Sequence, residues 1–287
     1  MEIKINFSLK KYNTLKIDCK TRYFTEIKNK TELIEAFKFA KSKNTPFKII
    51  GKGSNLLLAN RNLPYFVAMI INNDIKQEKE NFIINTGVFL PNLIGKLVKK
   101  NYAVAELAGF PSSIGGAIYG NAGTNGVAIG DFLKSATVFN IKTDQNEIWD
   151  QKKFKFAYRY SILKEKKNFI FWEGTFNFPS GENLIKKMQD FLQKRKKSQE
   201  YENTAGCIFK NPINNNPKKY SAGYLLEQCQ LKGFCRGGAK ISEKHANFFI
   251  NYKNAEYKDF FKLMTISQKK VWDKFKINLE PEIEIWN

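Results

Sequence analysis

The sequence has few of the residues that build metal sites and disulfide frameworks. It contains one histidine, His245, and four cysteines, at positions 19, 207, 229 and 235, without a Cys-x-x-Cys pair. Zinc sites take most of their ligands from these two residue types. Disulfides belong mainly to oxidising compartments. We therefore expect no metal centre, free thiols and a cytoplasmic location.

Long apolar runs are also missing. No stretch of about 18 uncharged apolar residues, the length needed to cross a bilayer, occurs anywhere in the chain. The opening residues, MEIKINFSLKKYNT, contain no apolar segment before a small-residue cleavage site. We expect neither a transmembrane helix nor a secretory signal, and no binding to membranes.

Acidic residues are scarce relative to basic ones, and the net charge is +21. A basic surface attracts phosphates, so nucleic-acid binding is one interpretation. The lysines are scattered along the chain, however, with neither an arginine-rich tail nor the aromatic motif of common RNA-binding modules. A basic surface attracts small anionic substrates equally well. We favour the interpretation that the lysines keep the surface solvated, and we expect no nucleic-acid partner.

Hydrophobic periodicity indicates a mixed α+β protein. At 287 residues and 43% apolar content, the chain is long enough for two or three domains with their own cores. Helical spacing predicts helices near 31–41, 91–100, 181–197, 221–229 and 257–274. Strand-like runs occur at 47–58, 65–72, 81–88, 136–178, 239–251 and 278–286.

Two glycine-rich stretches follow strand-like runs. They are IIGKGSNLLL, at 49–58, and ELAGFPSSIGGAIYGNAGTNG, at 106–126. Glycine permits positive φ and close backbone approach, and successive free N–H groups in such turns bind phosphate. Either stretch alone would be interpreted as an irregular turn. Together they favour a cofactor that carries a pyrophosphate.

The chain resembles the UDP-N-acetylenolpyruvoylglucosamine reductase family from residue 13 to its carboxyl terminus. The resemblance rests on sequence blocks in the family's order: IIGKGSNLLL, AGFPSSIGGAIYGNAGTNG, AYRYS, AGCIFKNP, AGYLLEQCQLKG, GGAKISEKHANFFIN and LEPEIEI. It implies an α+β fold with a two-lobed FAD-binding unit of the vanillyl-alcohol-oxidase type, followed by a carboxy-terminal α+β substrate domain.

By the same analogy the lobes span 1–60 and 61–195, and the substrate domain spans 196–287 with its last strand packed back towards the flavin. The length matches the family's shorter form, which lacks an inserted tyrosine-bearing lid. We expect a monomer.

The resemblance also implies a reaction. NADPH reduces noncovalently bound FAD, and flavin N5 then delivers a hydride to C3 of the enolpyruvyl group of UDP-N-acetylglucosamine enolpyruvate. A proton reaches C2, and the product is UDP-N-acetylmuramate, a peptidoglycan precursor. The flavin carries the hydride chemistry, and the protein supplies orientation, electrostatics and the proton.

Three residues match the family's catalytic positions. Arg159 in AYRYS corresponds to the arginine that binds the substrate carboxylate, and Glu282 in LEPEIEI to the glutamate beside it. Cys207 in AGCIFKNP replaces the usual serine that donates the proton to C2. From the residues alone, each has a structural alternative that remains open: Arg159 as a surface arginine, Cys207 as a buried structural cysteine and Glu282 as a solvated carboxylate on an edge strand. Glu280 and Glu284 share the strand face of Glu282 by the period of two, so only the family register selects Glu282.

The implied binding residues come from the same blocks. The FAD residues are Gly51, Gly53, Ser54, Asn55, Leu56, Gly109, Pro111, Gly115, Gly116, Asn121 and Gly123. The substrate residues, besides Arg159, are Arg195, Asn211 and His245. Ser112 departs from a usual glycine, and Glu284 stands where a basic residue is common.

Two other functions remain open. One is an FAD oxidase or dehydrogenase that acts on another substrate, and the other is a basic nucleic-acid-binding protein without catalysis. The joint presence of Arg159, Cys207 and Glu282 in the reductase's own blocks favours the reductase over the first. Bound flavin would distinguish it from the second.

Overall fold

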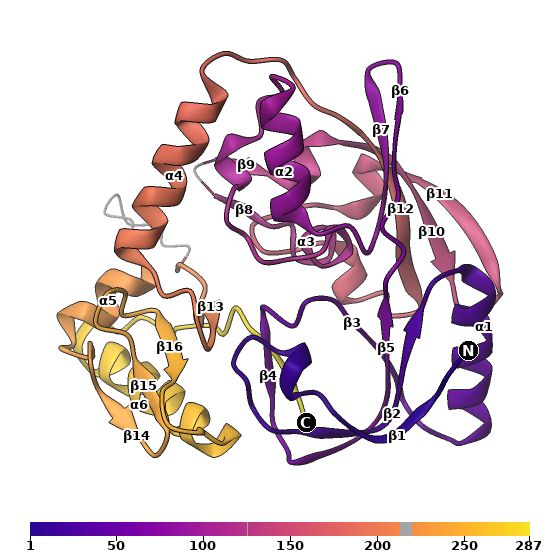
Figure 1. The fold of residues 1–287 in the computed structure, drawn as a ribbon. Coiled ribbons are helices and arrows are strands. Elements are labelled where there is room, and N and C mark those ends of the chain that lie inside the picture. The colour runs from indigo at the N-terminus through magenta and orange to yellow at the C-terminus, as the bar shows by residue number, and fades with distance from the viewer. Residues whose placement is uncertain (125, 213–219) are drawn as a thin grey trace. The chain divides into compact units, whose positions relative to one another are not determined.

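The computed structural model describes residues 1–124, 126–212 and 220–287, in which helices and strands are interspersed (Figure 1). The α-helices are α1 (Lys30–Ser42), α2 (Leu90–Lys99), α3 (Ile114–Gly120), α4 (Leu184–Ser198), α5 (Ala222–Gln228) and α6 (Tyr257–Phe275). Short 3-10 helices are η1 (Lys10–Tyr12), η2 (Ala105–Leu107), η3 (Ile129–Phe132), η4 (Gln151–Phe154) and η5 (Ile162–Lys164). The predicted α+β class is confirmed.

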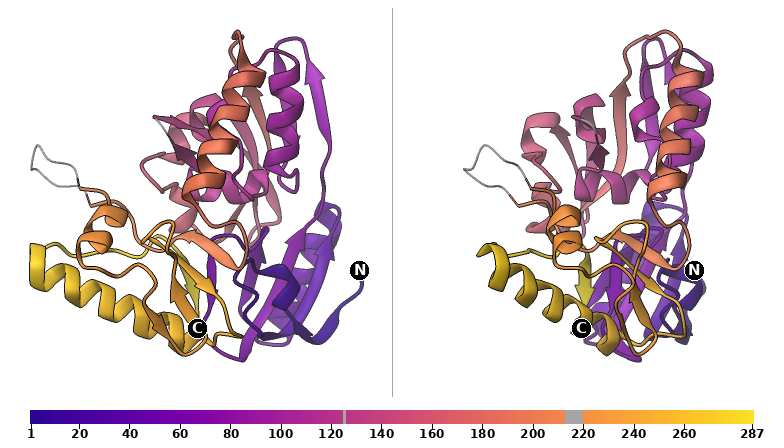
Figure 2. Two further views of the ribbon diagram at one scale, coloured as in Figure 1. Left: turned by 60° about the vertical axis from the view of Figure 1, so that its left-hand side comes forward. Right: turned by 90° about the vertical axis from the view of Figure 1, so that its left-hand side faces the viewer.

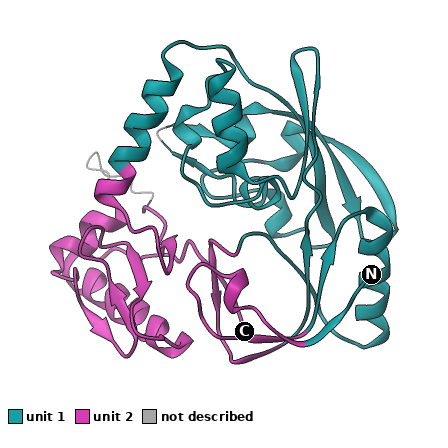
Figure 3. Cartoon of the chain, in the orientation of Figure 1, with its two compact units in different colours: residues 1–5, 23–52, 64–194 teal, residues 6–22, 53–63, 195–287 magenta. Residues whose placement is uncertain are grey.

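The chain divides into two compact units, each assembled from separate segments (Figure 3). Unit 1 comprises residues 1–5, 23–52 and 64–194, and unit 2 comprises residues 6–22, 53–63 and 195–287. The division expected from the family resemblance, 1–60, 61–195 and 196–287, follows chain order and stays a prediction.

A four-stranded sheet contains most of the amino-terminal strands. Its order is β1 (Lys4–Ser8), β2 (Lys20–Ile27), β5 (Asn62–Ile70) and β3 (Phe47–Ile50), and β3 and β5 run parallel. Helix α1 begins after Asn29, whose side chain accepts a hydrogen bond from the backbone N–H of Glu32 at 2.9 Å. Asparagine is favoured at this position because it pairs one of the free N–H groups of the first turn.

A five-stranded antiparallel sheet forms the rest of the unit 1 framework. Its order is β11 (Gln145–Asp150), β10 (Leu133–Asn140), β12 (Phe169–Asn177), β7 (Asn81–Asn85) and β6 (Ile75–Glu78). Helices α2 and α3 bury their apolar faces in the same hydrophobic cluster as β7, β10 and β12. The buried residues of α2 recur at helical spacing and are Leu90, Leu93, Ile94, Leu97 and Val98. A small hairpin, β8 (Gly123–Thr124) and β9 (Val127–Ala128), follows α3.

Unit 2 is built on a second four-stranded sheet, with α6 packed beside it (Figure 2). The strand order is β13 (Thr204–Cys207), β16 (Phe248–Asn251), β15 (Ala239–Ile241) and β14 (Cys235–Arg236). A separate parallel pair joins β4 (Leu56–Leu58) to β17 (Glu284–Trp286), with Glu284 opposite Leu56. The carboxyl terminus is therefore paired with the first glycine-rich stretch.

The predicted elements agree with the structure best where the hydrophobic period is long. Helices α1, α2 and α6 lie within about two residues of their predicted bounds, as is usual for pattern-based boundaries. The helix predicted from residue 181 begins at Leu184, because Asn183 has a left-handed φ of 55°. The strand predicted at 278–286 is reduced to Glu284–Trp286.

Candidate active site

Arg159 lies in a tight turn after η4, where Ala157 and Tyr160 form an isolated antiparallel bridge. Its φ is 57°, in the left-handed region that is uncommon for side chains other than Asn, Asp and Gly. The half-buried guanidinium donates a hydrogen bond from Nη1 to the carbonyl oxygen of Gly123, at 3.0 Å. This bond holds the arginine to the second glycine-rich stretch.

A second residue of that stretch supports the same turn. Asn121 follows α3 with a φ of 45°, and its Nδ2 donates to the carbonyl oxygen of Ala157 at 3.1 Å. Its Oδ1 accepts from the backbone N–H of Gly130 at 3.1 Å. Within unit 1, the structure thus brings one predicted catalytic residue, Arg159, together with two predicted cofactor residues, Asn121 and Gly123.

Closely packed backbone surrounds the start of α3. Ser113 accepts a hydrogen bond from the N–H of Gly116 at 3.3 Å and so caps the helix. A Cβ on Gly51 would lie 3.0 Å from the Ser113 hydroxyl, and one on Gly116 would lie 2.8 Å from the Ser112 hydroxyl. A Cβ on Gly115 would overlap the hydroxyl of Thr86. The chain's own packing therefore excludes side chains at these three positions.

Other predicted cofactor glycines are required by the conformation of the chain itself. Gly53 has a φ of 61°, and a Cβ there would overlap the carbonyl oxygen of Tyr12. Gly109 has a φ of 83°. A Cβ on Gly123 would lie 2.6 Å from the carbonyl oxygen of Val127, across the β8–β9 hairpin. These glycines shape the loops, whatever the loops bind.

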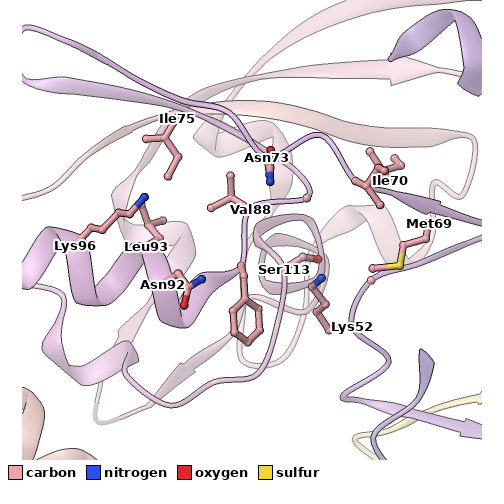
Figure 4. Close-up of a pocket in the computed structure, with 14 residues that line it drawn as sticks. Lys52, Met69, Ile70, Asn73, Ile75, Val88, Asn92, Leu93, Lys96 and Ser113 are labelled. Carbon is pink, nitrogen blue, oxygen red and sulfur yellow. The ribbon is translucent and has the colours of Figure 1, made fainter. Parts of the chain in front are cut away.

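A cavity of about 310 Å³ in unit 1 adjoins the start of α3 (Figure 4). Gly51, Lys52 and Ser113 line it together with Asn92 and Lys96 of α2. Lys52 and Ser113 lie next to each other in the close-up, and Lys96 extends from the helix towards the loop that carries Asn73. Two ammonium groups and exposed backbone at one cavity suit an anionic ligand.

In unit 2, Cys207 and Glu282 come from adjacent backbone segments. Phe209 and Pro281 form an isolated antiparallel bridge. The N–H of Glu282 donates to the carbonyl oxygen of Ile208 at 2.7 Å, and the N–H of Lys210 donates to that of Glu280 at 2.8 Å. Cys207 and Glu282 are thus one register position apart on neighbouring segments, and both are half-buried.

The same segment contacts the first glycine-rich stretch. Asn55 donates from Nδ2 to the carbonyl oxygen of Glu282 at 3.1 Å, and its own carbonyl oxygen accepts from the N–H of Glu284 at 3.0 Å. Leu56 is buried in β4 beside it. Unit 2 therefore brings Asn55 and Leu56, predicted to bind FAD, to the same segment as Glu282.

The three glutamates of the last segment have different surroundings. Glu280 is exposed and lies 3.3 Å from the ammonium group of Lys210. Glu282 and Glu284 are half-buried, and Glu284 begins β17. The exposed ion pair makes Glu280 the least suitable of the three for a desolvated site.

The predicted substrate residues occupy separate places in unit 2. Arg195, in the last turn of α4, donates from Nη1 to Oε1 of Gln199 at 3.4 Å. Asn211 accepts from the N–H of Ala222 at the start of α5, at 3.0 Å. His245 accepts from the N–H of Asn247 through Nδ1 at 3.1 Å, and burial lowers the pKa of its imidazole. A neutral imidazole would contribute hydrogen bonds, not charge, to a diphosphate.

The remaining cysteines have structural surroundings. Burial raises the pKa of Cys19 to about 12, and burial also raises that of Cys229. The thiol of Cys235 donates to the carbonyl oxygen of Gly233 at 3.2 Å. In the described part of the chain, no group of three or more His, Cys, Asp or Glu residues is arranged to bind a metal ion. None of the described helices is both long and apolar enough to cross a membrane.

Asn247, which no sequence pattern singles out, lies buried against the segment that follows Cys207. Asn247, in the block GGAKISEKHANFFIN, is 1% exposed and bonds to both Ile208 and Phe209. Its only signal in the sequence is its position two residues after His245. The spacing alone does not reveal which backbone it contacts.

The comparisons with known proteins first define the class. The profile of the FAD binding domain family matches residues 21–143, which include the cavity and the start of α3. The chain is therefore a flavoprotein oxidoreductase, and FAD is its cofactor. The profile of the carboxy-terminal domain of UDP-N-acetylenolpyruvoylglucosamine reductase matches residues 196–286.

Whole-chain relatives then define the family. A UDP-N-acetylenolpyruvoylglucosamine reductase of Prochlorococcus marinus is 34% identical over 98% of this chain and 95% of its own. One of Chlamydia felis is 35% identical over 96% of this chain and 92% of its own. The crystal structure of the Thermus caldophilus reductase superposes with a TM-score of 0.82 at 28% identity, covering 100% of this chain and 98% of that one.

The chain belongs to the UDP-N-acetylenolpyruvoylglucosamine reductase family and is an enzyme of that family. The family and the fold class expected from the sequence blocks are confirmed. NADPH as the hydride donor is consistent with membership of this reductase family.

The packing at Gly115 generates a test of the start of α3. Gly115→Ala should destabilise the protein by about 1–3 kcal/mol, because the methyl group overlaps the Thr86 hydroxyl. Gly120→Ala, in the same helix with no atom within 4 Å of the added methyl, should be neutral or stabilising by about 0.5–1 kcal/mol. Thermal unfolding of both variants, with and without added FAD, measures the difference. Equal stability of the two variants would contradict the close packing.

Proposed function

We propose that the protein reduces UDP-N-acetylglucosamine enolpyruvate to UDP-N-acetylmuramate with electrons from NADPH, a step in peptidoglycan precursor synthesis. Family membership supports the substrate class. The observation that best supports the roles of Cys207 and Glu282 is the pairing of segment 208–210 with segment 280–282, which brings the backbones of these two residues close together. We further propose a cytoplasmic monomer that binds neither membranes nor nucleic acid.

The FAD-binding residues are those of the two glycine-rich stretches. Gly51, Gly115 and Gly116 offer backbone without a Cβ, and the cavity with Lys52 and Lys96 suits the phosphate-bearing half of the cofactor. When bound there, FAD would supply the hydride-transfer chemistry between NADPH and C3 of the enolpyruvyl group. The other residues proposed to bind FAD are Ser54, Asn55 and Leu56 of the first stretch, and Gly109, Pro111, Asn121 and Gly123 of the second.

Arg159 binds the substrate carboxylate. Hydride addition at C3 leaves negative charge at C2 that is shared with the carboxylate, and a guanidinium stays charged while it pairs with both oxygens. The bond to Gly123 and the turn supported by Asn121 fix the direction of the side chain before substrate arrives. Preorganised charge of this kind stabilises a transition state without further rearrangement.

Cys207 donates the proton to C2. A thiol is a stronger acid than the serine hydroxyl usual at this position, and solvent can reprotonate it after each turnover. Glu282 stabilises the enolic form of the substrate by a hydrogen bond to, or a proton shared with, the substrate carboxylate. Arg195, Asn211 and His245 are the proposed contacts for the nucleotide part of the substrate.

FAD should be bound noncovalently. Cys19 is 1% exposed and His245 lies in the carboxy-terminal domain, so neither is suited to flavin attachment in the FAD-binding domain. Acid precipitation of the purified yellow protein should release all flavin into the supernatant. Flavin absorbance that stays with the washed pellet would contradict this expectation.

Arg159→Lys should be costly although the charge is kept. Lysine cannot form the bidentate pair with the substrate carboxylate. Loss of this pair should slow flavin reoxidation by the enolpyruvyl substrate about 10- to 100-fold, since a hydrogen bond to a charged group contributes about 1.5–3 kcal/mol. Reduction by NADPH should change little. Arg236→Lys, an exposed arginine of β14, is the control and should behave like wild type. Equal slowing of both half-reactions in Arg159→Lys would argue against carboxylate binding.

Cys207→Ala should keep FAD binding and NADPH-driven reduction, whereas reoxidation should fall about 10²–10⁴-fold, the usual effect of removing a general acid. Cys207→Ser should recover much of that loss. Cys235→Ala, a half-buried thiol in the same sheet, is the control and should keep both rates. Rapid mixing under anaerobic conditions separates the half-reactions. If folded Cys207→Ala is reoxidised at the wild-type rate, Cys207 is a packing residue and not the proton donor.

A further inference from the structure

The side-chain amide of Asn247 hydrogen bonds both backbone polar groups of one residue. Its Oδ1 accepts from the N–H of Phe209 at 3.0 Å, and its Nδ2 donates to the carbonyl oxygen of Phe209 at 2.8 Å. Phe209 is fully buried and Asn247 is 1% exposed. Since no water reaches these groups, the amide is their replacement for a strand partner.

The backbone of Asn247 extends this contact towards Cys207. Its carbonyl oxygen accepts from the N–H of Ile208 at 2.9 Å. The carbonyl oxygen of Ile208 in turn accepts from the N–H of Glu282 at 2.7 Å. Asn247 therefore hydrogen bonds to both residues that follow Cys207, Ile208 and Phe209. Ile208 in turn hydrogen bonds to the backbone of Glu282.

The orientation of Asn247 is itself fixed by its neighbours. Its N–H donates to Nδ1 of His245 at 3.1 Å, and the N–H of Phe248 donates to the carbonyl oxygen of His245 at 2.9 Å. The lowered pKa of His245 keeps the imidazole neutral, so that Nδ1 remains an acceptor. The backbone of Asn247 is therefore fixed by His245 just before β16, and its side-chain amide is fixed by Phe209.

A bulge lies on the amino-terminal side of Cys207. Gly206 has a φ of 76°, and the pairing of β13 with β16 shifts register between Thr204 and Cys207. The ladder that would otherwise fix the backbone is interrupted at this point. Beyond the bulge Cys207 pairs with Phe248, and the contacts from Asn247 fix the next two residues, on the carboxy-terminal side of the thiol.

We propose that Asn247 is a positioning residue for the proton-transfer step, which fixes the segment that carries Cys207 relative to the segment that carries Glu282. This inference rests on the proposed role of Cys207 as proton donor. A general acid must lie within hydrogen-bond reach of the atom that it protonates. Displacement of a catalytic group by about 1 Å costs about 10²-fold in rate.

Asn251 offers a matched control in the same strand region. It is 8% exposed, its Nδ2 donates to the carbonyl oxygen of Leu15 at 2.9 Å, and its Oδ1 accepts from the N–H of Ala255 at 2.7 Å. Removal of either amide therefore deprives two backbone groups of their partners. Only Asn247 makes its side-chain bonds to the segment that follows Cys207.

The experiment compares Asn247→Ala and Asn251→Ala as FAD-loaded full-length proteins. Both should lose thermal stability to a similar extent. For the folded protein, Asn247→Ala should slow flavin reoxidation by the enolpyruvyl substrate about 10²-fold, with reduction by NADPH unchanged. Asn251→Ala should keep both rates near wild type. If the two variants slow reoxidation equally, Asn247 has a structural role only and the proposal is overturned.

Asn247→Asp adds a readout that stability alone does not predict. Its carboxylate still accepts from Phe209 but, when ionised, has no proton to donate to the Phe209 carbonyl. Burial beside that carbonyl oxygen raises the pKa of the introduced carboxyl group, and below this pKa the neutral acid regains the donor. Relative to wild type at each pH, reoxidation by Asn247→Asp should recover as pH falls. A pH-independent ratio to wild type would overturn the proposal, and this variant decides the question if Asn247→Ala does not fold.

Cys207→Ala separates this proposal from the one on which it rests. Normal reoxidation in folded Cys207→Ala would remove the proton-donor role, and the positioning proposal with it. A collapse of reoxidation in Cys207→Ala, together with unchanged reoxidation in folded Asn247→Ala, would keep the proton donor and reject only the positioning role.

Discussion

Pairing of the carboxy-terminal segment on both of its sides is the constraint on which the candidate site in unit 2 depends. Residues 280–282 bond to Ile208 and Lys210, and residues 282–286 bond to Asn55 and β4. Segments from the start, the last third and the end of the chain thereby become neighbours. No local contact along the chain could bring Cys207, Glu282 and the first glycine-rich stretch together, because they are far apart in the sequence. The backbone bonds of the last segment bring them together.

In unit 1, the second glycine-rich stretch has two physical roles. Around Gly115 and Gly116 it is packed too closely for side chains, and the adjoining cavity with Lys52 and Lys96 suits a phosphate-bearing cofactor. Around Asn121 and Gly123 it bonds to the turn that carries Arg159. One stretch thus couples the cofactor loop to the proposed carboxylate-binding arginine. A change in the glycine loop is expected to affect substrate binding as well as flavin binding.

Much of this could be predicted from the sequence, because the long helices have strong hydrophobic periods and the family blocks are collinear. The terminal strand was predicted too long, since Pro281 has no N–H to donate and regular pairing with β4 begins only at Glu284. The role of Asn247 was not predicted. An amide that bonds to backbone 38 residues away leaves no local pattern. Likewise, the sequence did not show that the chain's own packing requires glycine at Gly53, Gly115 and Gly123.

The most direct test of the whole account is anaerobic mixing of the purified yellow protein with one equivalent of NADPH, followed by UDP-N-acetylglucosamine enolpyruvate. NADPH should bleach the flavin absorbance and the enolpyruvyl substrate should restore it, with one UDP-N-acetylmuramate formed per NADPH oxidised. A protein that binds FAD but is not reoxidised by this substrate would contradict the proposed reaction. A colourless protein that cannot be reconstituted with FAD would contradict its assignment as a flavoprotein.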